Sequence, residues 1–193
     1  AAGSLVMGTG IWSMHFLGMQ AFTLPITIGF SSGMTLLSWV AALAAAGVAL
    51  ELASREHFGF RQLVLGALAM GAGISGMHYI GMGAMDMAPG IVWDPFIVAL
   101  SVLIAVLASA AALLIFKLLR QVHAGQRLKY QLGASWVMAV AICGMHYTGM
   151  AAASFLMGSV CLSAGELGGP GLTVLVLMAA GMLLVSTLFT SIL

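Results

Sequence analysis

Long stretches without any charged side chain limit the fold of this chain more than any other feature. Residues 1–50 and 95–116 contain no Asp, Glu, Lys or Arg. Over all 193 residues, 62% of the side chains are hydrophobic and 6% are charged, whereas about a quarter are charged in an average soluble domain. Roughly 20 consecutive apolar residues suffice for a helix to cross a membrane. The sequence therefore predicts an integral membrane protein and excludes a soluble globular domain.

Proline, glycine and charged residues divide the chain into six apolar segments, each long enough for a transmembrane helix. We place these segments at roughly 1–23, 33–53, 62–86, 95–119, 130–157 and 170–193. The expected fold class is all-α, a polytopic membrane helix bundle. Residues 1–193 are expected to form a single membrane domain.

The basic residues predict the orientation of this bundle. They gather at two connections, and all of them belong to the following set: Arg55, Arg61, Lys117, Arg120, Arg127 and Lys129. The positive-inside rule places both connections in the cytoplasm. The first, third and fifth segments then run outward, and Leu193 ends on the cytoplasmic side. His57 and His123 fall in the cytoplasmic connections, where we expect solvated side chains.

One short motif occurs on each of the three outward-running segments. It reads SMHFLGM at 13–19, GMHYIGM at 76–82 and GMHYTGM at 144–150. The repeating unit is therefore a pair of helices, and every unit has the same orientation. Parallel repeats are related by an axis along the membrane normal, so we expect pseudo-threefold symmetry with the motif helices at its centre. By the same logic we expect a partner helix before the first motif helix, making seven in the full domain, and we expect that this chain lacks the first of them.

The motif histidines are expected to lie at one depth. His78 follows Arg61, and His146 follows Lys129, by 17 residues, which is about 26 Å of helix. In a hydrocarbon layer about 30 Å thick, this places them near the outer face. The methionines one residue before and four residues after each histidine share its helix face. The methionines that stand eight positions before each histidine (Met7, Met70 and Met138) are interpreted as packing residues.

Imidazole and thioether together form a soft set of metal ligands. Imidazole suits copper, zinc, iron and nickel, and methionine sulfur favours Cu(I). Ionisable residues inside membrane spans are functional by default, although methionine also commonly fills gaps in helix packing. We therefore predict one or two copper ions bound by His15, His78, His146, Met14, Met19, Met77, Met82, Met145 and Met150. Asp86, two turns beyond His78, is the acid placed to balance the charge of the ion.

Other chemistries are excluded by what the sequence lacks. It contains no HExxH, no CxxC, no Ser/His/Asp pattern and no paired carboxylates, so we expect no catalysis by this domain. The stretch GAGISG at 71–76 has the form of a dinucleotide-binding fingerprint but lies within a span. The basic residues set the orientation of the helices in the membrane, so no nucleic acid partner is expected. Cys143 and Cys161 are too far apart along the chain to form a disulfide.

The three Met-His-[Tyr/Phe]-x-Gly-Met copies resemble the bacterial MHYT sensor domain. The resemblance implies a multi-pass domain of the bacterial inner membrane, joined to a cytoplasmic output module in the same polypeptide, such as one for cyclic-di-GMP turnover. It also implies copper binding through the Met, His and Tyr of the motif, and sensing of a diatomic gas (O2, CO or NO) or of metal or redox state. Tyr79 and Tyr147 would then lie beside the metal. Phe16 replaces tyrosine in the first copy, so the tyrosines are expected to orient or pack.

Two alternative functions remain open at this point. A Met-rich face on parallel helices also suits a copper or cation transport pathway, and two of the three histidines would suffice to bind haem. Besides the lipid bilayer, a second copy of the chain is a partner that we leave open. The last segment contains the small residues Ala179, Ala180, Gly181 and Ser186. We expect it to pack closely on the motif helices and to carry the signal to the output module.

Overall fold

The structure is a computed structural model that describes residues 2–55, 59–119 and 124–192. Within these ranges it contains six helices, so the expected all-α bundle is confirmed. His57, His123 and Arg120 lie outside the described residues. The helices are α1 (Ala2–Gln20), α2 (Ser32–Ser54), α3 (Phe60–Gly83), α4 (Pro95–Leu119), α5 (Ala124–Ala151) and α6 (Gly169–Ile192).

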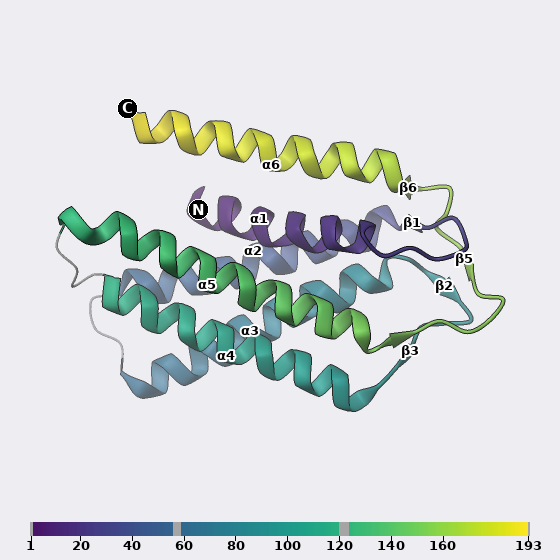
Figure 1. Cartoon of the computed structure of the whole chain (residues 1–193), viewed down its shortest axis with the longest axis horizontal. Coiled ribbons are helices and arrows are strands. Elements are labelled where there is room, and N and C mark those ends of the chain that lie inside the picture. Colours follow the sequence, from purple (N-terminus) through teal and green to yellow (C-terminus); the bar gives the residue numbers. More distant parts are fainter. Residues whose placement is uncertain (1, 56–58, 120–123, 193) are drawn as a thin grey trace.

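Neighbours in sequence are neighbours in the bundle. α2 packs between α1 and α3, and α4 packs between α3 and α5. Figure 1 shows α1, α3 and α5 running in one direction, from the end where the N-terminus lies toward the end that carries the strands. The three motif helices are thus parallel to one another, as the repeat predicted.

The partner helices α2 and α4 pack through rows of alanine. On α2, Ala42, Ala45, Ala46 and Ala49 are buried at the spacing of one helix face. On α4 the corresponding row is Ala105, Ala108 and Ala112. Such small side chains allow helix backbones to approach closely within a membrane.

The surface of the bundle that faces away from its central axis is apolar. Leu100, Leu103 and Leu107 on α4 are about half exposed and lie along one face of the helix. By length and composition, α2, α3 and α4 are each able to cross a membrane, with mean hydropathies of 1.9, 1.5 and 2.8. An apolar surface on such helices faces lipid rather than water. The chain is therefore an integral membrane protein.

Three short antiparallel ladders join the connections at one end of the bundle (Figure 1). The sequence did not predict them. Every ladder uses the α5–α6 connection, so this one segment ties the other two connections together. The pairs are β1 (Gly29–Phe30) with β6 (Leu167–Gly168), β2 (Met87–Ala88) with β5 (Val160–Cys161), and β3 (Val92–Trp93) with β4 (Ala153–Ser154).

Side chains strengthen the same connections. The carboxylate of Glu166 accepts hydrogen bonds from the backbone N–H of Ser32 (2.8 Å) and from its hydroxyl (3.1 Å), at the first residue of α2. The thiol of Cys161 donates to the carbonyl oxygen of Met85 (2.9 Å). Cys143 and Cys161 are both free thiols, as expected. The strand-bearing end is thus a connected layer above the helices.

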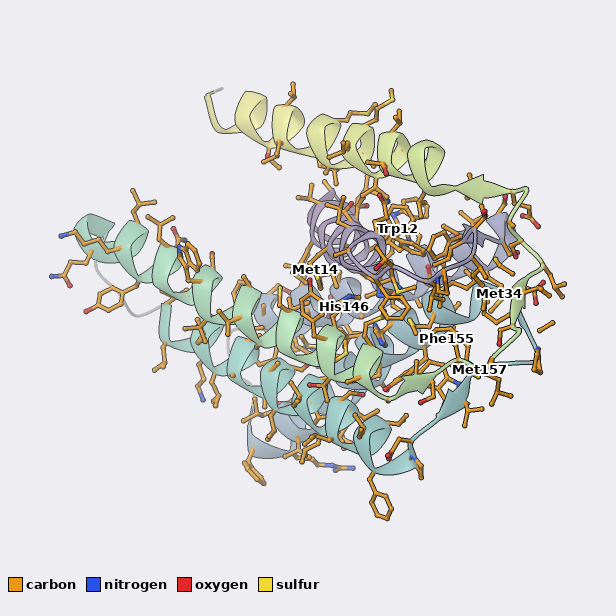
Figure 2. The ribbon with its side chains drawn as sticks, turned by 45° about the vertical axis from the view of Figure 1, so that its right-hand side comes forward. Trp12, Met14, Met34, His146, Phe155 and Met157 are labelled. Atoms are coloured by element: carbon orange, nitrogen blue, oxygen red, sulfur yellow. The ribbon has the colours of Figure 1, made fainter. Side chains whose placement is uncertain are left out.

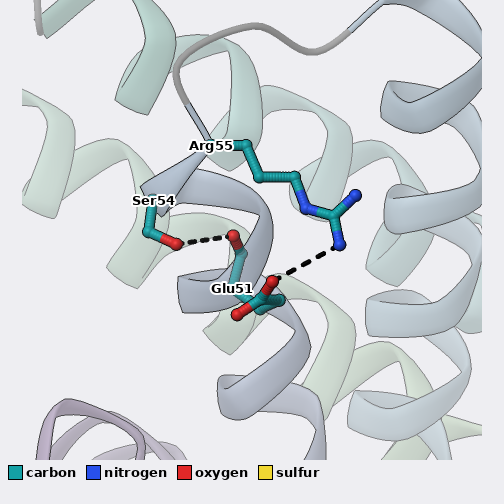
Figure 3. A network of polar contacts seen from close by, with 3 residues as sticks. All are labelled: Glu51, Ser54 and Arg55. Atoms are coloured by element: carbon teal, nitrogen blue, oxygen red, sulfur yellow. Dashed lines mark hydrogen bonds and ion pairs between the residues drawn. The ribbon is translucent and has the colours of Figure 1, made fainter.

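The opposite end of α2 carries a small polar network (Figure 3). The hydroxyl of Ser54 donates to the carbonyl oxygen of Glu51, and the Arg55 guanidinium pairs with the Glu51 carboxylate at 3.3 Å. Exposed pairs of this kind contribute at most about 1 kcal/mol. Charge at this end therefore matters more for membrane orientation than for stability.

α6 packs mainly on α1. Leu172 and Val176 are fully buried, and the hydroxyl of Thr173 bonds to the side chain of Gln20. The expectation of close packing at Gly181 is wrong, because a side chain built there would meet no atom within 4 Å. The side chain of Ser186 lies outside the described residues. Among the described side chains, the fully buried contacts of α6 therefore come from its first half.

Candidate metal centre

The three motif histidines stand at the same level of the bundle. His15, His78 and His146 each lie five residues before the last residue of α1, α3 and α5 respectively. Five residues of helix correspond to about 7.5 Å, so all three lie close to the strand-bearing end. Their exposed fractions are 0%, 0% and 1%. The expected convergence of the imidazoles at one depth is confirmed.

The imidazoles meet through their Nδ1 atoms. Nδ1 of His15 lies 3.2 Å from Nδ1 of His146 and 3.1 Å from Nδ1 of His78. The ring centroids are 4.9 to 5.2 Å apart, and the ring planes are nearly perpendicular to one another. In Figure 2, His146 is labelled among the helices, and Phe155 and Met157 are labelled to its right. The rings thus surround one point on the axis between the motif helices.

A second, cyclic relation connects the three copies of the motif. A Cβ atom added at Gly81 would lie closer than 3.0 Å to Nε2 of His15, and the same holds for Gly149 with His78 and Gly18 with His146. Each glycine stands three residues after the histidine of its own copy and makes room for the imidazole of another copy. This role was not predicted from the sequence, although the glycine stands at the same position in all three copies of the motif.

The Nε2 atoms of the three rings are buried and have no hydrogen-bond partner in the part of the chain that the structure describes. Among the described residues, no Cys, Asp or Glu joins the histidines in a potential metal-binding group. A neutral imidazole carries one proton, and a ligating nitrogen must be free of it. Binding of an ion through Nδ1 would therefore leave the proton on Nε2. The cluster offers three neutral ligands and no compensating negative charge.

The size of the cluster fits one metal ion. Two imidazole nitrogens bound to the same ion at about 2.0–2.1 Å stand roughly 3.3–3.6 Å apart at tetrahedral or trigonal angles. The observed separations of 3.1 and 3.2 Å are a few tenths of an ångström shorter. A small outward movement of the rings would accommodate the ion. Three neutral nitrogen ligands in a buried site favour a monovalent ion, since buried uncompensated charge is costly.

The predicted methionine ligands lie in the same region, but not all in one cluster. Met19, Met77, Met82 and Met150 are buried together in the apolar layer at the strand-bearing end. The other two lie elsewhere: Met145 packs against Ile74, Ala45 and Ala105, and Met14 is half-buried on α1. Ligation by methionine sulfur stays a prediction.

The three residues expected beside the metal occupy different positions. The Tyr79 ring meets the His78 ring edge-on, and its hydroxyl bonds to the hydroxyl of Ser101 at 2.5 Å. Tyr147 meets His146 in the same way but is 55% exposed. Asp86 is exposed in the turn after α3 and does not belong to the histidine group. The charge balance that we expected from Asp86 is therefore not provided by this structure.

Comparison with known families supports a signalling role. The family model named MHYT and described as a bacterial signalling protein N-terminal repeat matches residues 8–66 and 71–128. These two matches contain the first two copies of the motif.

Curated relatives include three longer signalling proteins. The chain is 53% identical over 165 residues to the bifunctional diguanylate cyclase/cyclic di-GMP phosphodiesterase MucR of Pseudomonas aeruginosa, over 85% of this chain and 24% of the relative. It is 39% identical to the cyclic di-GMP phosphodiesterase NbdA of the same organism and 38% identical to the signaling protein YkoW of Bacillus subtilis. Those matches cover 78% and 79% of this chain and 19% of each relative. The chain thus spans about a quarter or less of their length.

No solved structure matches the chain.

Proposed function

The chain belongs to the MHYT family of bacterial signalling proteins, and from this premise we propose that it is a membrane sensor domain that binds copper at His15, His78 and His146. The single observation that carries the proposal is the convergence of three buried Nδ1 atoms on one point. Three buried imidazoles with no acidic partner are costly to retain in a membrane unless they have a ligand. Imidazole suits copper, and an uncharged buried site favours Cu(I) over a divalent ion.

The proposed ligand set begins with the three Nδ1 atoms. Met19, Met77, Met82 and Met150 belong to the buried apolar cluster at the strand-bearing end, and any of their sulfur atoms that reaches the ion would add to the preference of the site for Cu(I). Bound copper would supply a redox-active centre with an open position for a diatomic gas such as O2, CO or NO. The protein's own part is to hold the imidazoles rigidly and to exclude water.

The proposed output lies outside this domain. Two of the relatives carry names for cyclic-di-GMP synthesis or hydrolysis, and this chain covers only a small part of each. We infer that the domain regulates a cytoplasmic output module in the same polypeptide, with cyclic-di-GMP turnover as the first candidate. The domain itself would then be the sensor and not the enzyme. Its location would be the bacterial inner membrane.

The alternatives fit this geometry less well. Haem bound by two histidines requires the porphyrin plane between their ligating nitrogens, and Nδ1 atoms 3.1 Å apart leave no space for it. A transport pathway requires polar or ligating groups along the whole axis. The methionines end at Met7, Met70 and Met138, and each is preceded by an aliphatic residue (Val6, Ala69 and Val137). Both observations favour a closed binding site.

The direct test is metal analysis of the purified protein. The wild type should carry, or take up, about one Cu(I) per chain at the histidine cluster, and the variant His15→Ala/His78→Ala/His146→Ala should carry none. The variant His57→Ala/His123→Ala replaces the two histidines outside the motif. It serves as the matched control and should keep its copper. Equal copper in the wild type and the triple variant, both eluting as folded protein, would disprove copper binding at this cluster.

A further inference from the structure

An apolar cavity of about 340 Å³ lies on the axis of the bundle, on the side of the histidines away from the strands. Each copy of the repeat contributes the same two positions to its lining. Ile11, Ile74 and Ile142 stand four residues before the histidines, and Met7, Met70 and Met138 stand eight residues before them. The isoleucine layer is therefore one helical turn, about 6 Å, from the histidine cluster.

The lining of this cavity offers almost nothing to a polar ligand. Its hydroxyl groups belong to Ser109 and Ser135, and each donates to a carbonyl oxygen of its own helix, that of Ala105 or Gln131. A buried water molecule needs two to four polar partners, and apolar cavities without them stay dry and bind benzene or xenon. A cavity of only about 150 Å³ is enough for benzene. The chemistry therefore favours a small, uncharged, apolar molecule.

The cavity opens on the flank of α5. Ser135 and Ala139 line the cavity and are exposed, and Phe116 on α4 is 40% exposed beside them. The neighbouring side chains on α5, Trp136 and Val140, are 75% and 66% exposed. In a membrane this apolar flank contacts lipid tails. A molecule that enters here comes from the hydrocarbon core of the bilayer and not from water.

The opposite side of the histidine cluster is packed. Phe16, Met82 and Met85 are fully buried above the histidines, and Met19 is 2% exposed. The three strand pairs join the connections over this layer. The two sides of the cluster thus differ in kind, with dense packing toward the strands and a cavity toward the middle of the membrane.

We propose that this cavity binds a small uncharged apolar molecule, of the size of a diatomic gas or a xenon atom, taken up from the bilayer. It holds the molecule one helical turn from the histidine cluster. Binding in the cavity depends only on its shape and lining. Its use as the reservoir of a gas ligand rests on the copper function proposed above.

Xenon is a suitable probe for metal-free protein in lipid nanodiscs with ¹³C-labelled methionine methyl groups. Xenon pressure should shift the methyl signals of Met7, Met70 and Met138 along a saturable curve. The methyl signal of Met157, whose side chain is fully exposed, should change only linearly. Linear changes at all four methyl groups would show that xenon does not bind in the cavity and would overturn the proposal.

A filled cavity provides the second arm of the test. Ala108→Leu places three additional carbon atoms on the lining and should weaken xenon binding at least ten-fold. Ala110→Leu, on the same helix but outside the lining, is the matched control and should leave xenon binding unchanged. Equal binding in both variants would place xenon elsewhere. A Cu(I) titration that shifts the same three methyl groups and excludes xenon would show a second metal site instead, which also overturns the proposal.

The reservoir role has a separate readout. In copper-loaded protein, Ala108→Leu should slow the association of CO with the metal, whereas Ala110→Leu should not. Failure of copper loading would refute the copper function and leave the xenon result to decide the cavity. An unchanged CO association rate in a variant that no longer binds xenon would refute the reservoir alone.

Discussion

At the scale of single residues, the glycine of each motif copy is as closely tied to the site as the histidine. The side-chain position of Gly81 is occupied by the imidazole of His15. Gly81→Ala therefore forces this imidazole away from its place among the other two. Overpacking in a closely packed interior costs typically 1–3 kcal/mol. We expect a lower melting temperature and a loss of copper binding.

Gly76→Ala is the control for that substitution. Gly76 lies on the same helix, five residues earlier, and a Cβ atom there would meet nothing within 4 Å. The melting temperature and copper content of this variant should match those of the wild type or exceed them, since alanine is the better helix former. If Gly81→Ala kept full copper content, the imidazole of His15 would not be held by this contact.

Residue types and spacing predicted the histidines but not their surroundings. A charged or ionisable residue repeated inside apolar segments is visible in the sequence alone, and its depth follows from the helical rise. Contacts between copies are not visible in that way. The clash that requires glycine arises between residues 66 (Gly81 and His15) to 128 (Gly18 and His146) positions apart in the sequence. The exposure of Asp86 and Tyr147 depends on which helix covers them.

At the scale of elements, α6 is fixed by few contacts. Among its described side chains, Leu172 and Val176 are the fully buried ones, whereas Met182 and Leu184 further along the helix are 69% and 64% exposed. Leu172→Ala should destabilise the protein by about 2–5 kcal/mol, the usual cost of such a truncation at a buried site. Thermal unfolding in detergent measures this loss. Two of the three histidines belong to α3 and α5, whereas α6 packs mainly on α1, so the folded fraction should still bind copper.

Leu177→Ala is the matched control on the same helix. Leu177 is 55% exposed, so its truncation removes lipid-facing surface and should change the melting temperature little. Equal destabilisation by the two variants would mean that the buried face of α6 contributes no more to stability than its exposed face.

Helices and strands differ in how far the sequence determined them. Five of the six helices begin and end within three residues of the expected bounds. Their ends were predictable because Pro25, Pro95 and the charged connections interrupt the apolar runs. The exception is α5, which both begins and ends six residues before the expected bounds of 130 and 157. It ends at Ala151 because Ala153 and Ser154 pair with Val92 and Trp93. Two-residue strands carry no periodicity, so their pairing across distant connections left no pattern to detect.

At the scale of the whole molecule, the two ends of the bundle differ in charge and structure. The strand-bearing end lies beside the histidines and carries Asp86, Asp94 and Glu166, with no Lys or Arg in its connections. The basic residues belong to the other end, where α2 meets α3 and α4 meets α5. The positive-inside rule predicts that the strand-bearing end faces outward and that the metal centre lies near the outer face.

Cysteine labelling in intact cells tests this orientation. Met157, in the connection between α5 and α6, is fully exposed, and Gly59, at the start of α3, is exposed with space around it. In a Cys161→Ser background, which removes the natural thiol of the strand-bearing end, Met157→Cys should react with a membrane-impermeant maleimide in intact cells. Gly59→Cys should react only after the cells are permeabilised. The reverse pattern would turn the metal centre toward the cytoplasm, and a signal would then have to cross only about 7.5 Å of helix to leave the membrane on that side. With the predicted pattern it must instead cross the length of the bundle, past the apolar cavity.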